Sequence, residues 1–203
     1  MPDPNVDYYE ENAESFRRDT VNVDMTELYR PFLALLPASA AILDAGCGSG
    51  RDARAFLDLG YRVTAFDASP TLSRLASEHI ERPVFCMRFQ DLTWKQEFDG
   101  IWASASLLHV QTDELVPVLH RLCNALKPGG VLYASFKLGR GEREFRGRRF
   151  TDLDESGLAA LVNNPIGLNV LRNWTTSDKR PGREAERWLN VLLTKPEATC
   201  SDS

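Results

Sequence analysis

The chain has 203 residues, of which 43% are hydrophobic and 26% are charged, with 24 Lys and Arg against 29 Asp and Glu. This length suits one globular domain with a sizeable core. Ten Phe, five Tyr and four Trp argue against a disordered chain, and no apolar run approaches the roughly 18 residues that a membrane span needs. The acidic N-terminal residues lack the apolar segment of a secretory signal, so we expect a soluble protein of the cytoplasm.

Short apolar runs alternate with amphipathic stretches from residue 42 onward, which is typical of a parallel sheet covered by helices. Before residue 39, two apolar stripes predict a helical cover. The predicted strands are residues 41–44, 61–67, 84–89, 99–104, 131–136, 168–175 and 187–194. The predicted helices are residues 52–59, 70–80, 112–126 and 152–162, with residues 127–130 as a helix stop. Only about a dozen residues separate the last two strands, so these should pair as an antiparallel hairpin at the sheet edge.

A glycine-rich turn, residues 44–50, lies between the first predicted strand and the helix that follows it. Glycines permit a tight turn and let the backbone approach a ligand closely. A dinucleotide-binding turn would place its third glycine at position 51, but that residue is Arg51, which disfavours NAD and FAD. Asp67 ends the second strand 21 residues after Gly46, a distance at which a carboxylate can accept hydrogen bonds from ribose hydroxyls. The turn therefore predicts a nucleoside ligand.

Several motifs occur together and in order along residues 40–137. They are Asp-Ala-Gly-Cys-Gly-Ser-Gly at 44–50, Asp67, Gln-Asp-Leu at 90–92, Phe-Asp-Gly-Ile-Trp-Ala-Ser at 98–104 and Leu-Lys-Pro-Gly-Gly-Val at 126–131. This set resembles the class I S-adenosylmethionine-dependent methyltransferases. Gly-Arg-Asp at 50–52, followed by residues 56–63, resembles more narrowly the tellurite-resistance-type small-molecule branch.

The resemblance implies a single α/β domain over residues 1–203 with a doubly wound, Rossmann-like sheet. Its seven strands are mostly parallel, end in an antiparallel hairpin and form the middle of a three-layer αβα sandwich. Residues 1–38 would be the helical cover, 39–137 the cofactor-binding half, 138–196 the substrate-side half and 197–203 a disordered tail.

The resemblance also implies a set of cofactor-binding residues. Asp67 would hold the ribose, Asp91 would face the adenine amino group and Leu92 would lie against the ring. Asp44 would lie near the amino group of the methionine moiety, and Arg51 would reach its carboxylate. The full expected set is Asp44, Ala45, Gly46, Gly48, Gly50, Arg51, Asp67, Ala68, Asp91, Leu92, Ser104 and Tyr9. For Asp67 and Asp91, a helix-capping or turn carboxylate is the alternative.

Ligands of doubly wound sheets collect at the carboxyl ends of the strands, so residues 104–110 should line the acceptor site. His109 is the candidate catalytic base there, and a purely structural histidine is the alternative. The fourth strand lacks the Asn/Asp-Pro-Pro-aromatic signature of the family's amino-group methylators on bases and glutamine. A Pro-Cys nucleophile is also missing there.

Two stretches rich in arginine should project from the same face. Residues 137–150 carry six Lys and Arg against two Glu, and residues 178–187 carry four against three acids. These stretches are either solvated loops with paired charges or groups that bind an anionic acceptor. In the second, Arg183, Glu184 and Trp188 form a candidate lid.

We therefore predict an enzyme that moves a methyl group from S-adenosylmethionine to a small molecule by in-line displacement, releasing S-adenosylhomocysteine. An RNA or protein methyltransferase and a non-catalytic S-adenosylmethionine-binding module are the alternatives. The four cysteines form no C-x-x-C pair, so no metal site is expected. Nor are DNA or a membrane expected as partners, and the protein should be a monomer or a homodimer.

Overall fold

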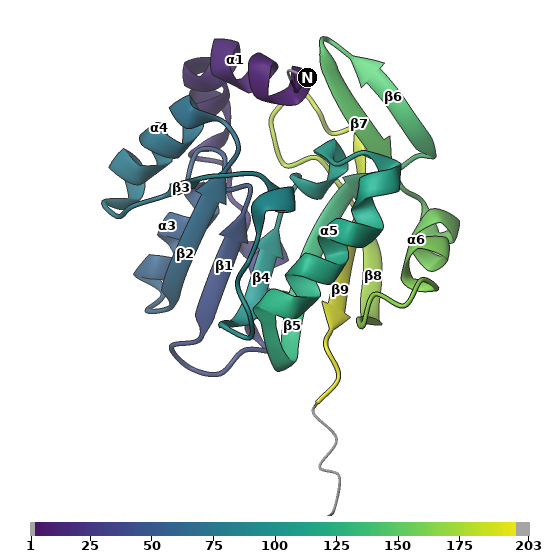
Figure 1. The fold of residues 1–203 in the computed structure, drawn as a ribbon. Helices are drawn as coiled ribbons and strands as arrows, with labels where there is room; N and C mark the ends of the chain where they lie inside the picture. Colours follow the sequence, from purple (N-terminus) through teal and green to yellow (C-terminus); the bar gives the residue numbers. More distant parts are fainter. Residues whose placement is uncertain (1–2, 198–203) are drawn as a thin grey trace, which may run out of the picture.

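The computed structural model describes residues 3–197. It contains a seven-stranded sheet in the order β3-β2-β1-β4-β5-β9-β8. The strands are β1 (Ala41–Ala45), β2 (Arg62–Asp67), β3 (Phe85–Cys86), β4 (Phe98–Ala103), β5 (Leu126–Lys137), β8 (Asn169–Ser177) and β9 (Arg187–Thr194). Strands β1 to β5 run parallel, whereas β9 pairs antiparallel with both β5 and β8. The predicted doubly wound sheet with a terminal antiparallel hairpin is confirmed (Figure 1).

Alternate residues of each central strand face opposite layers of helices. Ile42 and Trp102 face the layer of α2 (Thr26–Leu33) and α3 (Arg51–Asp58), with Phe32 and Phe56 completely buried against them. On the other face, Leu43 and Ile101 pack with α5 (Thr112–Ala125) and α6 (Glu155–Val162). The sheet is therefore buried on both sides, which explains its nearly continuous apolar strands.

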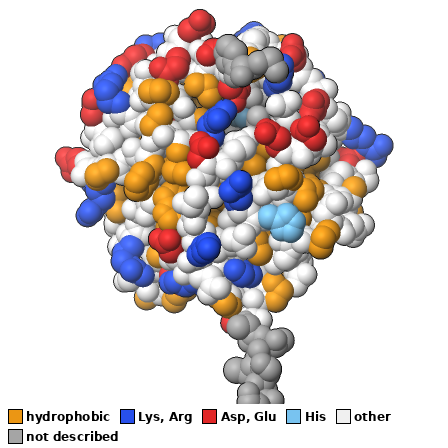
Figure 2. Space-filling view, viewed as in Figure 1, with side chains coloured by type: hydrophobic (Ala, Val, Ile, Leu, Met, Phe, Trp, Pro, Cys, Tyr) orange, Lys and Arg blue, Asp and Glu red, His pale blue; other side chains and the backbone are white. Residues whose placement is uncertain are grey.

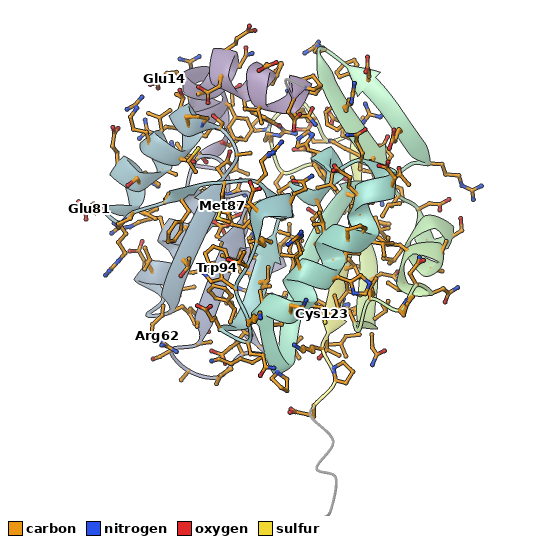
Figure 3. All side chains as sticks on the ribbon, in the orientation of Figure 1. Glu14, Arg62, Glu81, Met87, Trp94 and Cys123 are labelled. Carbon is orange, nitrogen blue, oxygen red and sulfur yellow. The ribbon has the colours of Figure 1, made fainter. Side chains whose placement is uncertain are left out.

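The edge of the sheet near β3 shows how side chains distribute between core and solvent. Trp94 packs edge-on against Phe98, with ring centroids 5.4 Å apart, and lies inward over the strands, whereas Arg62 and Glu81 lie at the periphery (Figure 3). The third strand is much shorter than the predicted residues 84–89. Phe85 is 51% exposed, and the chain turns into the short helix η1 (Phe89–Asp91). A longer strand here would therefore bury little apolar surface.

The predicted helix stop at residues 127–130 is wrong in detail. Helix α5 ends at Ala125, and these residues already belong to β5, where Gly129 adopts a φ of +75°. The predicted helix 152–162 begins later, at Glu155, because the Asp154 side chain accepts a hydrogen bond from the Gly157 amide.

The predicted loop at residues 137–150 is in fact a separate β-hairpin, with β6 (Gly141–Phe145) and β7 (Arg148–Asp152). The hairpin stands at the carboxyl end of the parallel strands, beside α1 (Pro4–Thr20), at the top of Figure 1. The Asn5 side chain on α1 accepts a hydrogen bond from the Arg149 amide on β7, which joins the two. Helix α1 also packs on α4 (Pro70–Ile80) through Ala13, Leu72 and Leu75.

In the part of the chain that the structure describes, no helix has both the length and the apolar character needed to cross a membrane. The expected disordered tail falls almost entirely on residues 198–203, which lie outside the described residues.

Candidate active site

A cavity of about 600 Å³ opens at the carboxyl ends of the parallel strands. Its wall is built by the glycine turn after β1, the ends of β2, β4 and β5, helix α1, the β6–β7 hairpin and the β8–β9 turn. This is the edge of a doubly wound sheet at which ligands bind. Of the residues predicted for the cofactor, those in the wall are Tyr9, Gly46, Gly48, Arg51, Asp67, Ala68 and Ser104, and the predicted base His109 joins them.

The glycine turn is held against the end of β2. The Gly46 and Cys47 amides both donate to the Phe66 carbonyl, at 3.0 and 2.9 Å. Gly46 has a φ of +77°, and a Cβ at this position would lie 2.5 Å from the Ser106 Cβ. The turn therefore needs glycine at position 46 for both its backbone conformation and its contact with Ser106.

Asp67 lies at the end of β2 and faces the glycine turn. Its Oδ2 accepts a hydrogen bond from the Gly48 amide at 2.8 Å, and its Oδ1 accepts one from the Ser69 amide at 2.9 Å. Burial raises the pKa of this carboxyl, while these backbone amides oppose the rise. Each oxygen keeps a second lone pair, so the group can accept hydrogen bonds from a pair of ligand hydroxyls.

Five predicted cofactor residues lie outside the cavity wall: Asp44, Ala45, Gly50, Asp91 and Leu92. Asp44 lies at the end of β1 and is only 2% exposed. Its Oδ2 has no hydrogen-bond partner among residues 3–197. Burial, followed by the nearby Asp52 carboxylate, raises the pKa of Asp44 well above its usual value. An unpartnered buried oxygen of this kind fits a ligand that brings a cationic donor.

Asp91 is exposed, and its Oδ2 accepts a hydrogen bond from the Arg88 amide at 3.1 Å. In this conformation Asp91 is therefore a turn carboxylate, which is the alternative role expected from the sequence. Its neighbours Arg88, Phe89 and Gln90 line the cavity, whereas Leu92 is buried in the core.

Arg51 is tied to a buried network beneath the turn. Its Nε and Nη2 donate to Asp52 at 2.6 and 2.9 Å, and Asp52 also accepts from Tyr29 Oη at 2.5 Å and Trp102 Nε1 at 2.8 Å. Burial alone would raise the pKa of Asp52, but Arg51 and these hydrogen bonds lower it. The remaining terminal nitrogen, Nη1, makes a long contact of 3.5 Å with the Thr20 carbonyl.

His109 is held by two hydrogen bonds in the cavity wall. Its Nδ1 lies 2.9 Å from the Arg149 carbonyl, and its Nε2 lies 2.9 Å from Tyr9 Oη. A carbonyl only accepts, so Nδ1 carries the proton and Nε2 accepts from the Tyr9 hydroxyl. Burial lowers the pKa of His109 to about 4, and the cation of Arg148 adds to this effect. The imidazole is therefore neutral at pH 7.

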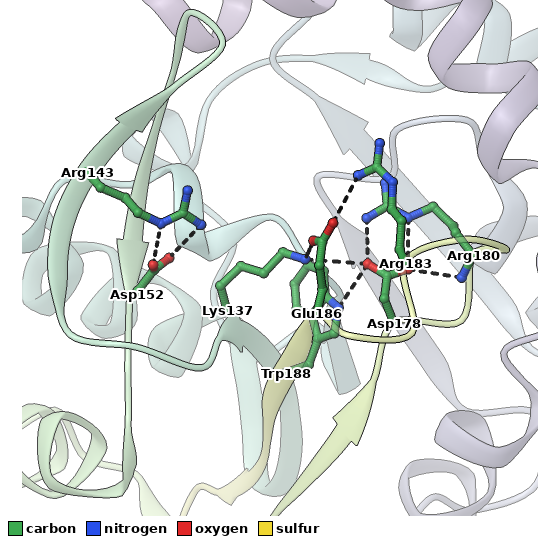
Figure 4. A network of polar contacts seen from close by, with 8 residues as sticks. All are labelled: Lys137, Arg143, Asp152, Asp178, Arg180, Arg183, Glu186 and Trp188. Carbon is green, nitrogen blue, oxygen red and sulfur yellow. Dashed lines mark hydrogen bonds and ion pairs between the residues drawn. The ribbon is translucent and has the colours of Figure 1, made fainter.

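The two arginine-rich stretches meet around the cavity and form ion pairs (Figure 4). Arg143 bonds Asp152 on the hairpin, and Arg180 bonds Asp178 in the β8–β9 turn. Lys137 pairs with Asp178 and Glu186 and lies 3.9 Å from the centre of the Trp188 ring. Most of these charges are therefore neutralised within the chain, as one of the two sequence interpretations expects.

Two of the three residues of the candidate lid, Arg183 and Trp188, line the cavity, whereas Glu184 does not. Trp188 Nε1 donates to Asp178 at 3.1 Å, and Glu184 accepts from the Gly182 amide at 3.0 Å. Sequence reasoning missed Asn5, whose amide nitrogen donates to the His109 carbonyl at 3.1 Å. It also missed Phe150, the aromatic wall beside His109, with ring centroids 5.1 Å apart.

Residues 3–197 contain no group of three or more His, Cys, Asp or Glu side chains that could hold a metal ion.

Residues 42–130, which include the glycine turn and Asp67, match the family described as a methyltransferase domain. The seven-stranded sheet around this segment has the Rossmann-like fold that solved methyltransferases also have.

Two curated proteins that resemble the chain in sequence are named methyltransferases. The chain is 35% identical over 163 residues to a cypemycin N-terminal methyltransferase of Streptomyces sp, across 78% of this chain and 61% of that protein. It is 32% identical over 108 residues to a ubiquinone biosynthesis O-methyltransferase of Xanthomonas axonopodis pv. citri, across 50% of this chain and 44% of that protein. The chain thus spans about three fifths of the first relative and less than half of the second.

Among solved structures, the 1,6-didemethyltoxoflavin-N1-methyltransferase of Burkholderia thailandensis, bound to 1,6-didemethyltoxoflavin and S-adenosylhomocysteine, superposes with a TM-score of 0.78. The alignment covers 96% of this chain and 88% of that chain at 23% identity. This likeness establishes a shared fold.

Proposed function

We propose that the protein is an S-adenosylmethionine-dependent methyltransferase. The observation that carries the proposal is the pairing of the glycine turn with Asp67 Oδ2, 2.8 Å from the Gly48 amide, in the wall of the cavity. The family match over residues 42–130 and the methyltransferase relatives support the same activity. In this scheme residues 39–137 form the cofactor half of the domain and 138–196 the acceptor half.

S-adenosylmethionine supplies an electrophilic methyl group on a sulfonium sulfur. Asp67 would accept hydrogen bonds from the ribose hydroxyls, and the unpartnered Oδ2 of Asp44 would accept from the ammonium group. Asp91 would turn toward the adenine amino group, and Arg51 would reach the cofactor carboxylate through Nη1. The other residues proposed to contact the cofactor are Tyr9, Ala45, Gly46, Gly48, Gly50, Ala68, Leu92 and Ser104.

The acceptor would be a small molecule that fits the cavity of about 600 Å³. Nine Lys and Arg residues line this cavity against six Asp and Glu residues, which favours an anionic acceptor. Displacement at the methyl group needs the acceptor atom to be aligned with the sulfonium, and the residues of the cavity wall would supply this alignment. When the acceptor atom carries a proton, that proton would pass to the Tyr9 oxygen while the Tyr9 proton passes to His109 Nε2.

A peptide amine is the second candidate acceptor, because the relative at 35% identity is named for methylation at an N terminus. RNA is less favoured. Over the upper part of the face seen in Figure 2, basic side chains are interspersed with acidic ones, and Arg143, Arg180 and Arg183 of the cavity each pair with a carboxylate. A polyanion binds a continuous basic surface instead. The tellurite-resistance-type branch, action in the cytoplasm and a monomeric or homodimeric state stay predictions from the sequence.

Isothermal titration with S-adenosylhomocysteine tests the proposal, with micromolar or tighter binding expected. Absence of binding to both the cofactor and its product would contradict it.

A second experiment identifies the acceptor class. The protein is incubated with S-adenosylmethionine and one of three panels of candidate acceptors, and release of S-adenosylhomocysteine is measured. The panels are small organic acids, short peptides with free or acetylated N termini, and RNA oligonucleotides. Release with free but not acetylated peptides would favour the amine acceptor, and cofactor binding with no release across the panels would favour a non-catalytic module.

A further inference from the structure

Arg148, the first residue of β7, lies in the cavity wall between aromatic rings. Its Cζ lies 4.4 Å from the centre of the Tyr8 ring and 5.0 Å from the centre of the Phe150 ring. Aromatic rings near a guanidinium hold its plane and leave its N–H edge available for hydrogen bonds. The side chain is thus positioned by elements from both ends of the chain, α1 and the hairpin.

Arg148 lacks the partner that other arginines of the cavity have. Arg143, Arg180 and Arg183 each pair with a carboxylate of the chain (Figure 4). Among residues 3–197, no Asp or Glu oxygen lies within 4.0 Å of an Arg148 side-chain nitrogen, and its buried Nε makes no hydrogen bond. A buried N–H of a charged group without an acceptor costs free energy. A ligand that brings an acceptor to this place would remove that cost.

The groups next to Arg148 do not neutralise it. His109 is neutral at pH 7 because its pKa is about 4. Tyr9 is also neutral, because burial raises the pKa of its hydroxyl more than the nearby Arg148 lowers it. Asp152, the hairpin carboxylate in the cavity wall, is engaged by Arg143 Nε and by Nη2 at 3.3 Å. The positive charge at this end of the cavity is therefore available to a ligand.

We propose that Arg148 forms an oxyanion subsite that binds a carboxylate or phosphate group of the methyl acceptor. The inference rests on the proposed methyltransferase function and names the acceptor class as small organic anions. A guanidinium can donate two parallel hydrogen bonds to two oxygens of such a group. Tyr9 and His109 lie next to Arg148 within the same wall. The anionic group of the acceptor would therefore bind beside the two residues that are proposed to take the proton of the methylated atom.

The test uses the full chain saturated with S-adenosylhomocysteine and three probes of similar shape: benzoate, phenyl phosphate and uncharged benzamide. Calorimetric or NMR titration should show that benzoate or phenyl phosphate binds more tightly than benzamide, and the stronger of the two identifies the oxyanion. Arg148→Gln should weaken the preferred anion by about tenfold or more, as expected for lost charge-assisted hydrogen bonds. Arg146→Gln is the matched control, because Arg146 is exposed on the same hairpin and lies outside the cavity wall.

Equal affinity of the wild-type protein for all three probes overturns the subsite, as does an Arg148→Gln variant that binds the anion normally. If Arg148→Gln fails to fold, Arg148→Lys replaces it. The Arg148→Lys variant should bind the preferred anion less tightly than the wild type does, but more tightly than the wild type binds benzamide. Failure of the wild-type protein to bind S-adenosylhomocysteine would instead contradict the proposed function. The two failures are therefore distinguishable in one series of titrations.

Discussion

Tyr9 Oη and His109 Nε2 lie 2.9 Å apart, although 100 residues separate them in the chain. The Arg149 carbonyl fixes the His109 proton on Nδ1, so Nε2 accepts the Tyr9 hydroxyl proton. Nε2 is thus already engaged in this conformation. Under the proposed function, the histidine would therefore act through the tyrosine oxygen.

The protonation state of His109 can be measured without an acceptor. Nitrogen-15 NMR of labelled histidine should show a neutral ring with its proton on Nδ1 from pH 8 down to pH 5, because the pKa is about 4. Tyr9→Phe should leave this tautomer in place and shift the Nε2 resonance, since only the hydroxyl donor is lost. A His109 ring that titrates near its usual pKa of about 6.5 would contradict the geometry.

The same pKa shift predicts a loss of stability in acid. The unfolded chain binds a proton to this histidine near pH 6.5, whereas the folded chain does so only near pH 4. The contribution is therefore fully present above about pH 6.5 and is lost as the pH falls toward 4. Urea denaturation between pH 7.5 and 4.5 should show a shallower decline for His109→Gln than for the wild type. Burial also lowers the pKa of His79, so His79→Gln serves as a comparison. The stability of this variant should also decline less steeply with falling pH than that of the wild type, independently of the effect of His109→Gln.

Asp67→Asn should weaken S-adenosylhomocysteine binding by about tenfold or more, because the variant loses a charged acceptor. The raised pKa of Asp67 adds a dependence on pH: wild-type affinity should fall at a higher pH than an ordinary aspartate would predict. Titration calorimetry across pH 7.5 to 5 measures both effects. Asp58→Asn is the control, because Asp58 is exposed on α3 and pairs with Arg54, away from the glycine turn's hydrogen bonds. Equal losses in the two variants would argue against a direct role for Asp67.

Gly46 and Gly60 allow a matched test of the glycine turn. Both have positive φ values, +77° and +88°, but an added Cβ meets Ser106 only at Gly46 and nothing within 4 Å at Gly60. Gly46→Ala should therefore lower the free energy of unfolding by about 2–4 kcal/mol and weaken S-adenosylhomocysteine binding. Gly60→Ala should cost only about 1 kcal/mol and leave binding unchanged. Denaturation and calorimetry of the two variants check this, and similar behaviour of both would refute the steric argument.

The buried network at Asp52 predicts a graded loss of stability. Asp52→Ala leaves the Arg51 cation without its partner and should cost about 3–5 kcal/mol. Tyr29→Phe removes one of several donors and should cost about 1 kcal/mol. Urea denaturation of both variants gives the comparison. A Tyr29→Phe loss as large as that of Asp52→Ala would show that the carboxylate depends mainly on the tyrosine.

The parts of the site that depend on local sequence were predictable. The glycine turn and Asp67 are set by short-range spacing along one β-α-β unit, so the sequence could locate them. The β6–β7 hairpin was missed because its first strand is exposed throughout and lacks a buried face. Its signal was the Arg146-Gly147 turn, where φ values of +51° and +75° fit a two-residue hairpin loop. Asn5 has no such signal, since its partners lie 104 and 144 residues away.

The double role of Asn5 has a practical consequence. One amide side chain bonds the His109 carbonyl at 3.1 Å and the Arg149 amide at 2.8 Å. Glu10, one and a half turns further along the same helix, accepts from Thr71 at the start of α4 at 2.9 Å. Deletion of the first ten residues would therefore loosen the cofactor half and the hairpin together. An activity assay on a protein shortened at this end would report on damage to both, and a tag for purification belongs at the other terminus.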